Sequence, residues 1–155
     1  MSTISIRPYQ PSDFNTVVTL FKEAVATINI KHYTSEQIAT WTTINLERWQ
    51  ASLEKNITLV AEVDGIIVGF GDLRHEGYLD RLYVHKEYQA RFIALKIFKA
   101  LEQKARELGL EKITTDCSIT AKIPAERMGF KVIKEQVVEK RGIKFINYHM
   151  EKKLV

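Results

Sequence analysis

The sequence predicts an α/β fold of the α+β type, built around a mostly antiparallel sheet. Hydrophobic residues recur at helical spacing between residues 14 and 53 and again between residues 93 and 108, whereas residues 57–84 follow the two-residue period of strands. The chain has 155 residues, 45% hydrophobic and 27% charged, which is enough for one sizeable core and too little for two ordinary domains. We therefore expect a single domain over residues 1–155.

The N-terminal third predicts a short strand followed by helices. Residues 4–7 alternate like a strand, and Ser12 or Asp13 can cap the next helix. A second helix begins at the capping-box sequence of residues 34–37, and helical spacing resumes after an interruption at residues 42–43. The expected buried stripe of the first helix consists of Val17, Leu20, Phe21, Ala24, Val25 and Ile28.

A β-hairpin is the clearest local prediction. Two strand-like runs, residues 57–63 and 66–73, flank Asp64-Gly65, the dipeptide that best supports a type I′ turn. A third antiparallel strand is expected over residues 78–84, and an amphipathic helix then runs to about Leu108, where a glycine can end it.

The C-terminal third predicts further strands around a short helical segment. A strand is expected over residues 112–117, and a helical turn precedes residues 128–130. Two final strands are separated by Arg141-Gly142 and end over residues 145–150.

Charge and cysteine content limit the partners. The net charge of +4 favours an anionic ligand only modestly, and no nucleic-acid-binding motif accompanies it, so we expect no nucleic acid partner. Cys117 is the one cysteine, and the four histidines show no ligand spacing, so we expect neither a disulfide nor a metal. Residues 1–7 lack the apolar core of a signal peptide and no stretch could span a membrane, which predicts a cytoplasmic protein.

Residues 89–94, Gln-Ala-Arg-Phe-Ile-Ala, stand where a strand-turn-helix cradle for a phosphorylated cofactor belongs. Unpaired N–H groups and the helix dipole at such a position bind pyrophosphate, and small residues let its oxygens approach. Ala90 and Ala94 are small and Arg91 adds a cation. The ring of Phe92, in contrast, must point outward or block the site.

The stretch of residues 79–89, Leu-Asp-Arg-Leu-Tyr-Val-His-Lys-Glu-Tyr-Gln, resembles the pyrophosphate-loop region of the GNAT superfamily of acetyl-coenzyme A-dependent N-acyltransferases. The loop pattern of that family is Gln/Arg-x-x-Gly-x-Gly/Ala, and Phe92 stands at its first glycine. Residues 32–37 with Trp41, and residues 141–150, are similar to a bacterial subgroup of uncharacterised GNAT acetyltransferases. Other landmarks follow in the family's order at residues 6–8, 64–70, 118–122 and 129–130.

The resemblance implies a GNAT fold: a mixed, mostly antiparallel central sheet of about six to seven strands, flanked by about four helices. It also implies a parallel splay between the fourth and fifth strands, which would hold acetyl-coenzyme A (acetyl-CoA) as cosubstrate. The backbone of the fourth strand would hydrogen-bond the pantetheine arm. The implied cofactor-binding residues are Leu82, Val84, Gln89, Ala90, Arg91, Phe92, Ile93 and Ala94.

Acyl transfer to an amine requires a base for the ammonium proton. The resemblance implies that this base is Asp80, on the fourth strand and on the strand face of Leu82 and Val84. The alternative is a surface carboxylate paired with Arg81 or Lys86.

The leaving thiolate requires an acid, and here the chain departs from the family. Many GNAT enzymes place a tyrosine four residues before the Gly-Phe pair, but that position is Ala125, after Pro124, and neither can donate a proton. Tyr148, our candidate for the role, Cys117 and Tyr83 are chemically able to replace it. Packing remains the alternative role for these tyrosines.

Trp41 and Tyr33 lie in the second helical region, which in this superfamily helps to wall the acceptor site. Such an aromatic wall suits an amine on an apolar or cationic scaffold, with core packing as the alternative. No metal site is implied.

Two functions remain open at this point. The first is transfer of an acetyl group from acetyl-CoA to a primary amine of a small molecule or protein by direct attack. The second is a GNAT-fold binding or regulatory module without catalysis, for which Phe92 and Ala125 are the motive. A homodimer is an open alternative as well, because the sequence does not specify the oligomeric state.

Overall fold

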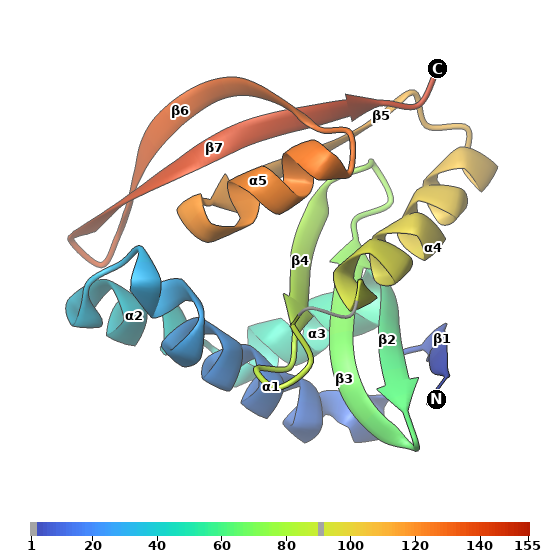
Figure 1. Cartoon of the computed structure of the whole chain (residues 1–155), viewed down its shortest axis with the longest axis horizontal. Helices are drawn as coiled ribbons and strands as arrows, with labels where there is room; N and C mark the ends of the chain where they lie inside the picture. Colours follow the sequence, from blue (N-terminus) through green and yellow to red (C-terminus); the bar gives the residue numbers. More distant parts are fainter. Residues whose placement is uncertain (1–2, 90–91) are drawn as a thin grey trace.

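The computed structural model describes residues 3–89 and 92–155, which form an α+β fold (Figure 1). The strands are β1 (Ile4–Pro8), β2 (Ile57–Val63), β3 (Ile66–Leu73), β4 (Leu79–Val84), β5 (Lys112–Ser118), β6 (Lys131–Lys140) and β7 (Ile143–Lys153). The α-helices are α1 (Phe14–Thr27), α2 (Ser35–Thr42), α3 (Leu46–Lys55), α4 (Ile93–Glu107) and α5 (Ile119–Arg127). Short 3-10 turns, η1 (Pro11–Asp13) and η2 (Asn29–Lys31), precede and follow α1.

The strands form two antiparallel sheets that meet at β4 and β5. One has the order β1-β2-β3-β4 and the other the order β5-β7-β6. A parallel bridge between Tyr78 and Thr114 joins them, with the Thr114 N–H donating to the Gly77 carbonyl at 2.9 Å. Beyond this bridge β4 and β5 diverge, as Figure 1 shows. The predicted splay is thereby confirmed, although the strands form two sheets rather than one.

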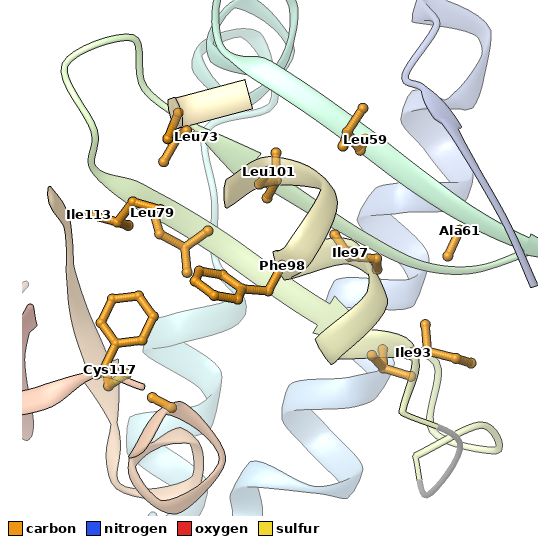
Figure 2. Close-up of a cluster of buried hydrophobic side chains, with 14 of the residues drawn as sticks. Leu59, Ala61, Leu73, Leu79, Ile93, Ile97, Phe98, Leu101, Ile113 and Cys117 are labelled. Carbon is orange, nitrogen blue, oxygen red and sulfur yellow. The ribbon is translucent and has the colours of Figure 1, made fainter. Parts of the chain in front are cut away.

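Helices cover both faces of the first sheet. Helix α4 packs on β3 from one side, where its residues Ile97, Phe98 and Leu101 enter the main core (Figure 2). Helices α1, α2 and α3 contribute to a second core on the opposite side. Close approach of α4 depends on glycine, since a Cβ at Gly71 would lie 3.0 Å from the Cγ2 atom of Ile97. Gly69 meets the same isoleucine, so this strand needs two residues without side chains.

The turn and the helix cap that were predicted from neighbouring residues are present in the structure. The Asp64-Gly65 turn has φ angles of 52° and 78°, as a type I′ turn requires. Thr34 accepts a hydrogen bond from the Gln37 N–H at 3.1 Å and its own N–H donates to the Gln37 side chain at 2.8 Å, which confirms the capping box. Asp13 instead closes the turn before α1, because its carboxylate accepts from the Gln10 N–H at 2.8 Å.

The structure differs from the sequence prediction in its helices. Five α-helices are present in the described ranges, against about four expected. The helical turn before Met128 is a full helix, α5, which continues through Pro124. Ser118 begins it by accepting a hydrogen bond from the Ala121 N–H at 3.1 Å. None of the described helices is both long and apolar enough to cross a membrane.

Candidate active site

A cavity of about 420 Å³ opens where β4 and β5 diverge. Both strands line it, together with α5, the C-terminal parts of α1 and α2, and the β6–β7 hairpin. One end lies against Val84, Gln89 and Ala94, and the other against Trp41 and Phe145. The cavity therefore connects the side of the sheet that α4 covers with the side that α1 and α2 cover.

The predicted cofactor-binding residues surround the first of these ends. Leu82, Val84, Gln89 and Ala94 line the cavity, and the Gln89 side-chain amide donates to the Val84 carbonyl at 2.6 Å. Ile93 is buried in the main core, so only its backbone can face a ligand. Ala90 and Arg91 lie outside the described residues.

The structure shows how the ring of Phe92 lies relative to the loop. The residue precedes α4 with φ 58° and ψ 22°, the left-handed conformation that a glycine adopts readily. Its side chain is 75% exposed, so the ring points into solvent. Phe92 thus adopts a backbone conformation that favours glycine, the residue that the family pattern has at this position.

Asp80 lies in a β-bulge. Asp72 pairs with Arg81 and Leu73 with Leu79, which leaves Asp80 without a partner on β3 and breaks the alternation of side chains. Leu82 and Val84 contact the core beneath α4.

The Asp80 carboxylate lies away from Leu82 and Val84. It is 3.3 Å from Arg74 Nε and 3.6 Å from Arg81 Nη2. The expectation that Asp80 shares a face with Leu82 and Val84 is therefore wrong, while its pairing with Arg81 is present. Lys86, the other partner considered, contacts Glu23 at 3.3 Å.

A buried ion pair, which sequence reasoning missed, holds this part of β4. The Arg81 guanidinium lies 2.6 Å from the fully buried Asp72 carboxylate and 4.6 Å from the centre of the Trp49 ring. Asn56 also donates to Asp72, at 3.0 Å. The sequence signal was available, since Asp72 is a carboxylate inside an otherwise apolar strand pattern.

Asp116 is a second carboxylate of the cavity, also missed from the sequence. It accepts hydrogen bonds from the Tyr78 hydroxyl at 2.8 Å, from His149 Nδ1 at 2.9 Å and from the Gln136 amide at 2.9 Å. Burial alone would raise the pKa of Asp116, but these three hydrogen bonds outweigh it and hold the pKa below its ordinary value. The three partners come from three separate segments of the chain, so no local sequence pattern could reveal this arrangement.

Of the three candidate acids, Cys117 and Tyr83 line the cavity and Tyr148 does not. Tyr148 makes a hydrogen bond to Glu135 on β6, and the Lys122 ammonium lies 4.9 Å from the centre of its ring. It packs with the core beneath α4 and α5. The structure therefore does not place Tyr148 in the cavity lining with Asp80, because its side chain is engaged by Glu135 and Lys122.

The aromatic wall of the acceptor end has three members. The Tyr33 and Trp41 rings meet edge to face with centroids 5.3 Å apart, and Phe145, which sequence reasoning missed, lies 6.4 Å from Trp41. Tyr33 is mostly structural: its hydroxyl donates to the Ile146 carbonyl at 3.0 Å and accepts from the Ile119 N–H at 2.7 Å. Trp41 and Phe145 are the more available surfaces.

Comparison with known proteins agrees with this geometry. A family model described as "Acetyltransferase (GNAT) domain" matches residues 29–152. The chain is 40% identical over 153 residues to the Uncharacterized N-acetyltransferase YafP of Escherichia coli (strain K12), covering 99% of this chain and 98% of that protein.

Solved structures give the same result. The crystal structure of a GCN5-related N-acetyltransferase from Rhodopseudomonas palustris superimposes with a TM-score of 0.95 at 29% identity, covering 99% of this chain and 98% of the other. PaiA N-acetyltransferase from Thermoplasma acidophilum, in complex with coenzyme A, has a TM-score of 0.80 at 21% identity and covers 97% and 99%. With its sequence matched over most of its length by the GNAT model and its fold shared with solved N-acetyltransferases, the chain belongs to the GNAT family of acetyltransferases.

Proposed function

We propose that this protein transfers an acetyl group from acetyl-CoA to a primary amine of a small molecule or protein. The observation that carries the proposal is the cavity that passes through the β4–β5 gap. Acyl transfer requires a thioester and an amine to meet in a fixed geometry, and this passage offers each of them its own side of the sheet. PaiA, which shares the fold, was crystallised with coenzyme A, which supports a coenzyme A thioester as the acetyl donor.

The residues at the α4 end fit acetyl-CoA. The first N–H groups of a helix have no intrahelical partner and favour an anion, and the outward ring of Phe92 does not cover them. Among the described residues the two sheets pair only at the Tyr78–Thr114 bridge, just before β4, so the edge of β4 at Leu82 and Val84 can hydrogen-bond an extended arm. We assign cofactor binding to this edge, to Gln89 and to the N-terminus of α4.

Asp80 is the proposed base. It lines the cavity beside the open edge of β4 and accepts the amine proton, directly or through one water. The freed amine nitrogen attacks the thioester carbonyl, so that a C–N bond forms as the C–S bond breaks, and the second proton that the nitrogen must lose passes to solvent. Arg74 and Arg81 hold the Asp80 carboxylate in place.

Solvent, rather than a side chain, supplies the proton to the leaving thiolate in this proposal. Burial raises the pKa of the Cys117 thiol to about 12, with Asp116 adding to the effect. Burial raises the pKa of Tyr83 as well. An ordinary thiol has a pKa of about 8.5, so proton transfer to the thiolate from either group would be uphill.

The test begins with acetyl-CoA binding, measured by calorimetry and by thermal shift, since a ligand of the folded state raises its stability by mass action. Turnover is then followed by thiol release with a panel of primary amines. We expect Asp80→Asn to lower kcat by roughly 10²-fold and to leave the Kd for acetyl-CoA nearly unchanged. Asp64→Asn, the same change in the β2–β3 turn, is the matched control. Cys117→Ser and Tyr83→Phe should keep kcat within about threefold if solvent protonates the thiolate.

The second function, a non-catalytic module, was suggested by Phe92 and Ala125. Phe92 no longer supports it, because its ring points into solvent. A protein that fails to bind millimolar acetyl-CoA, or that binds it and acetylates no amine, would favour that module over the enzyme.

A further inference from the structure

One face of the β5-β7-β6 sheet forms the wall of the acceptor end. Asp116 pairs with His149 and Ser118 with Asn147, so these four side chains occupy neighbouring positions on one face of the sheet. Asp116, Ser118 and Asn147 line the cavity. Phe145, two residues before Asn147 on the same strand, continues this face toward Trp41.

Asn147 has an unsatisfied acceptor in this wall. Its Oδ1 atom is buried and accepts no hydrogen bond from any residue that the structure describes. Buried polar atoms are nearly always paired, because leaving one unpaired costs stability. Since other atoms of Asn147 line the cavity, rotation of its amide group would present this oxygen to a donor on a ligand there.

The Asp116 carboxylate has no permanently charged partner among the described residues. Its three hydrogen-bond donors are a phenol, an amide and an imidazole, and within the described ranges no lysine or arginine forms an ion pair with it. Asp80, in contrast, contacts two guanidinium groups. The Asp116 Oδ1 atom accepts two of the three donors and Oδ2 only one, so Oδ2 keeps capacity for a further donor.

We propose that Asp116 and Asn147 form an ammonium-binding subsite at the acceptor end of the cavity. A positively charged group with several N–H donors matches a fixed carboxylate and an unpaired amide oxygen on one sheet face. Tyr78 and His149 are positioning residues, which hold the carboxylate in the orientation that the ammonium meets. The inference rests on the proposed acetyltransferase function and names its acceptor as an amine bound in the charged form.

Kinetics with three probe amines test the subsite: butylamine, butane-1,4-diamine and phenethylamine. Loss of a charge-assisted hydrogen bond predicts that Asp116→Asn raises KM for the amine roughly tenfold to hundredfold. Asn147→Leu should raise it about fivefold to tenfold, whereas Asn147→Asp should lower it, which a purely structural role of Asn147 would not produce. The Kd for acetyl-CoA should stay within about twofold in all three variants. The same is expected of two controls outside the cavity, Asp64→Asn in the β2–β3 turn and Asn15→Leu at an exposed position of α1.

The monoamines and the diamine distinguish two groups that the subsite could bind: the reacting ammonium and a second cation on the same acceptor. If the subsite receives the reacting group, Asp116→Asn raises KM for butylamine and for the diamine alike; if it receives a second cation, only the diamine is affected. Unchanged KM values in Asp116→Asn and Asn147→Leu would overturn the inference. So would a wild-type protein that binds acetyl-CoA but neither binds nor acetylates any of the three probes, whereas absence of acetyl-CoA binding would instead refute the proposed function.

Discussion

Phe92 combines a strained backbone with an exposed side chain. Its φ of 58° is a conformation that costs an L-residue about 1–2 kcal/mol, and its ring, 75% exposed, recovers little of that by packing. We predict that Phe92→Gly raises the free energy of unfolding by about 0.5–1 kcal/mol, after allowance for the greater chain entropy of unfolded glycine. Urea denaturation measures the change.

Phe92→Ala is the control, because alanine keeps the Cβ and therefore the strain. It should leave stability nearly unchanged, and neither variant should alter the Kd for acetyl-CoA by more than about twofold, since the ring does not cover the α4 N-terminus. Lower stability in both variants would mean that the ring packs against the protein.

Gly71 sets how closely α4 approaches β3. An added Cβ would lie 3.0 Å from the side chains of both Ile97 and Leu82 and 3.2 Å from the Arg81 carbonyl, so Gly71→Ala forces these elements apart. We predict a loss of about 1–3 kcal/mol in the free energy of unfolding. In Gly71→Ala/Ile97→Ala, removal of the contacting Cγ2 methyl should make the loss smaller than the sum of the two single changes. Additive losses in urea denaturation would place the strain elsewhere.

Asp13 ties β1 to the start of α1. Its carboxylate accepts from Arg7 Nη1 at 2.8 Å and Nη2 at 3.0 Å, and the Arg7 hydrogen bond lowers the pKa of Asp13 below its ordinary value. A lowered pKa in the folded state stabilises the protein above the unfolded pKa of about 3.9, and that stability is lost as the pH falls through the folded pKa.

Asp13→Asn should therefore lower the free energy of unfolding by about 1–2 kcal/mol at pH 7, and the difference from wild type should narrow toward pH 3. Urea unfolding of both proteins at the two pH values measures this. A difference that is independent of pH would exclude the ion pair as its cause.

At the scale of the whole molecule, the two sheets are joined at a narrow junction. Besides the Tyr78–Thr114 bridge, the buried Thr115 hydroxyl donates to the Leu79 carbonyl at 2.8 Å. Thr115→Val keeps the shape but leaves this carbonyl unpaired, so we predict a loss of about 1–3 kcal/mol in the free energy of unfolding.

Hydrogen exchange of the Thr114 N–H should also become faster in Thr115→Val, because that group bonds across the same junction. Thr114→Val, the same change on the neighbouring residue, is the control, since it leaves the Thr115 hydroxyl in place. Unchanged exchange in Thr115→Val would show that the junction does not depend on this bond.

The sequence by itself determined the features that depend on neighbouring residues. The Asp64-Gly65 turn and the Thr34 capping box were predictable because each is decided within four residues. Family membership was predictable because short motifs recur in a fixed order along the chain. Together these gave the fold and the splay between the fourth and fifth strands, since α+β topology follows from the order and type of elements.

Only the tertiary structure decided the contents of the site. Asp80 escapes strand alternation through a bulge, which depends on how β3 and β4 pair, and Tyr148 bonds Glu135 on β6 outside the cavity lining. The three hydrogen bonds that hold the Asp116 carboxylate come from residues 20 to 38 positions away along the chain. Register and long-range side-chain contacts are set by packing of the whole chain, so no local stretch of sequence contains them.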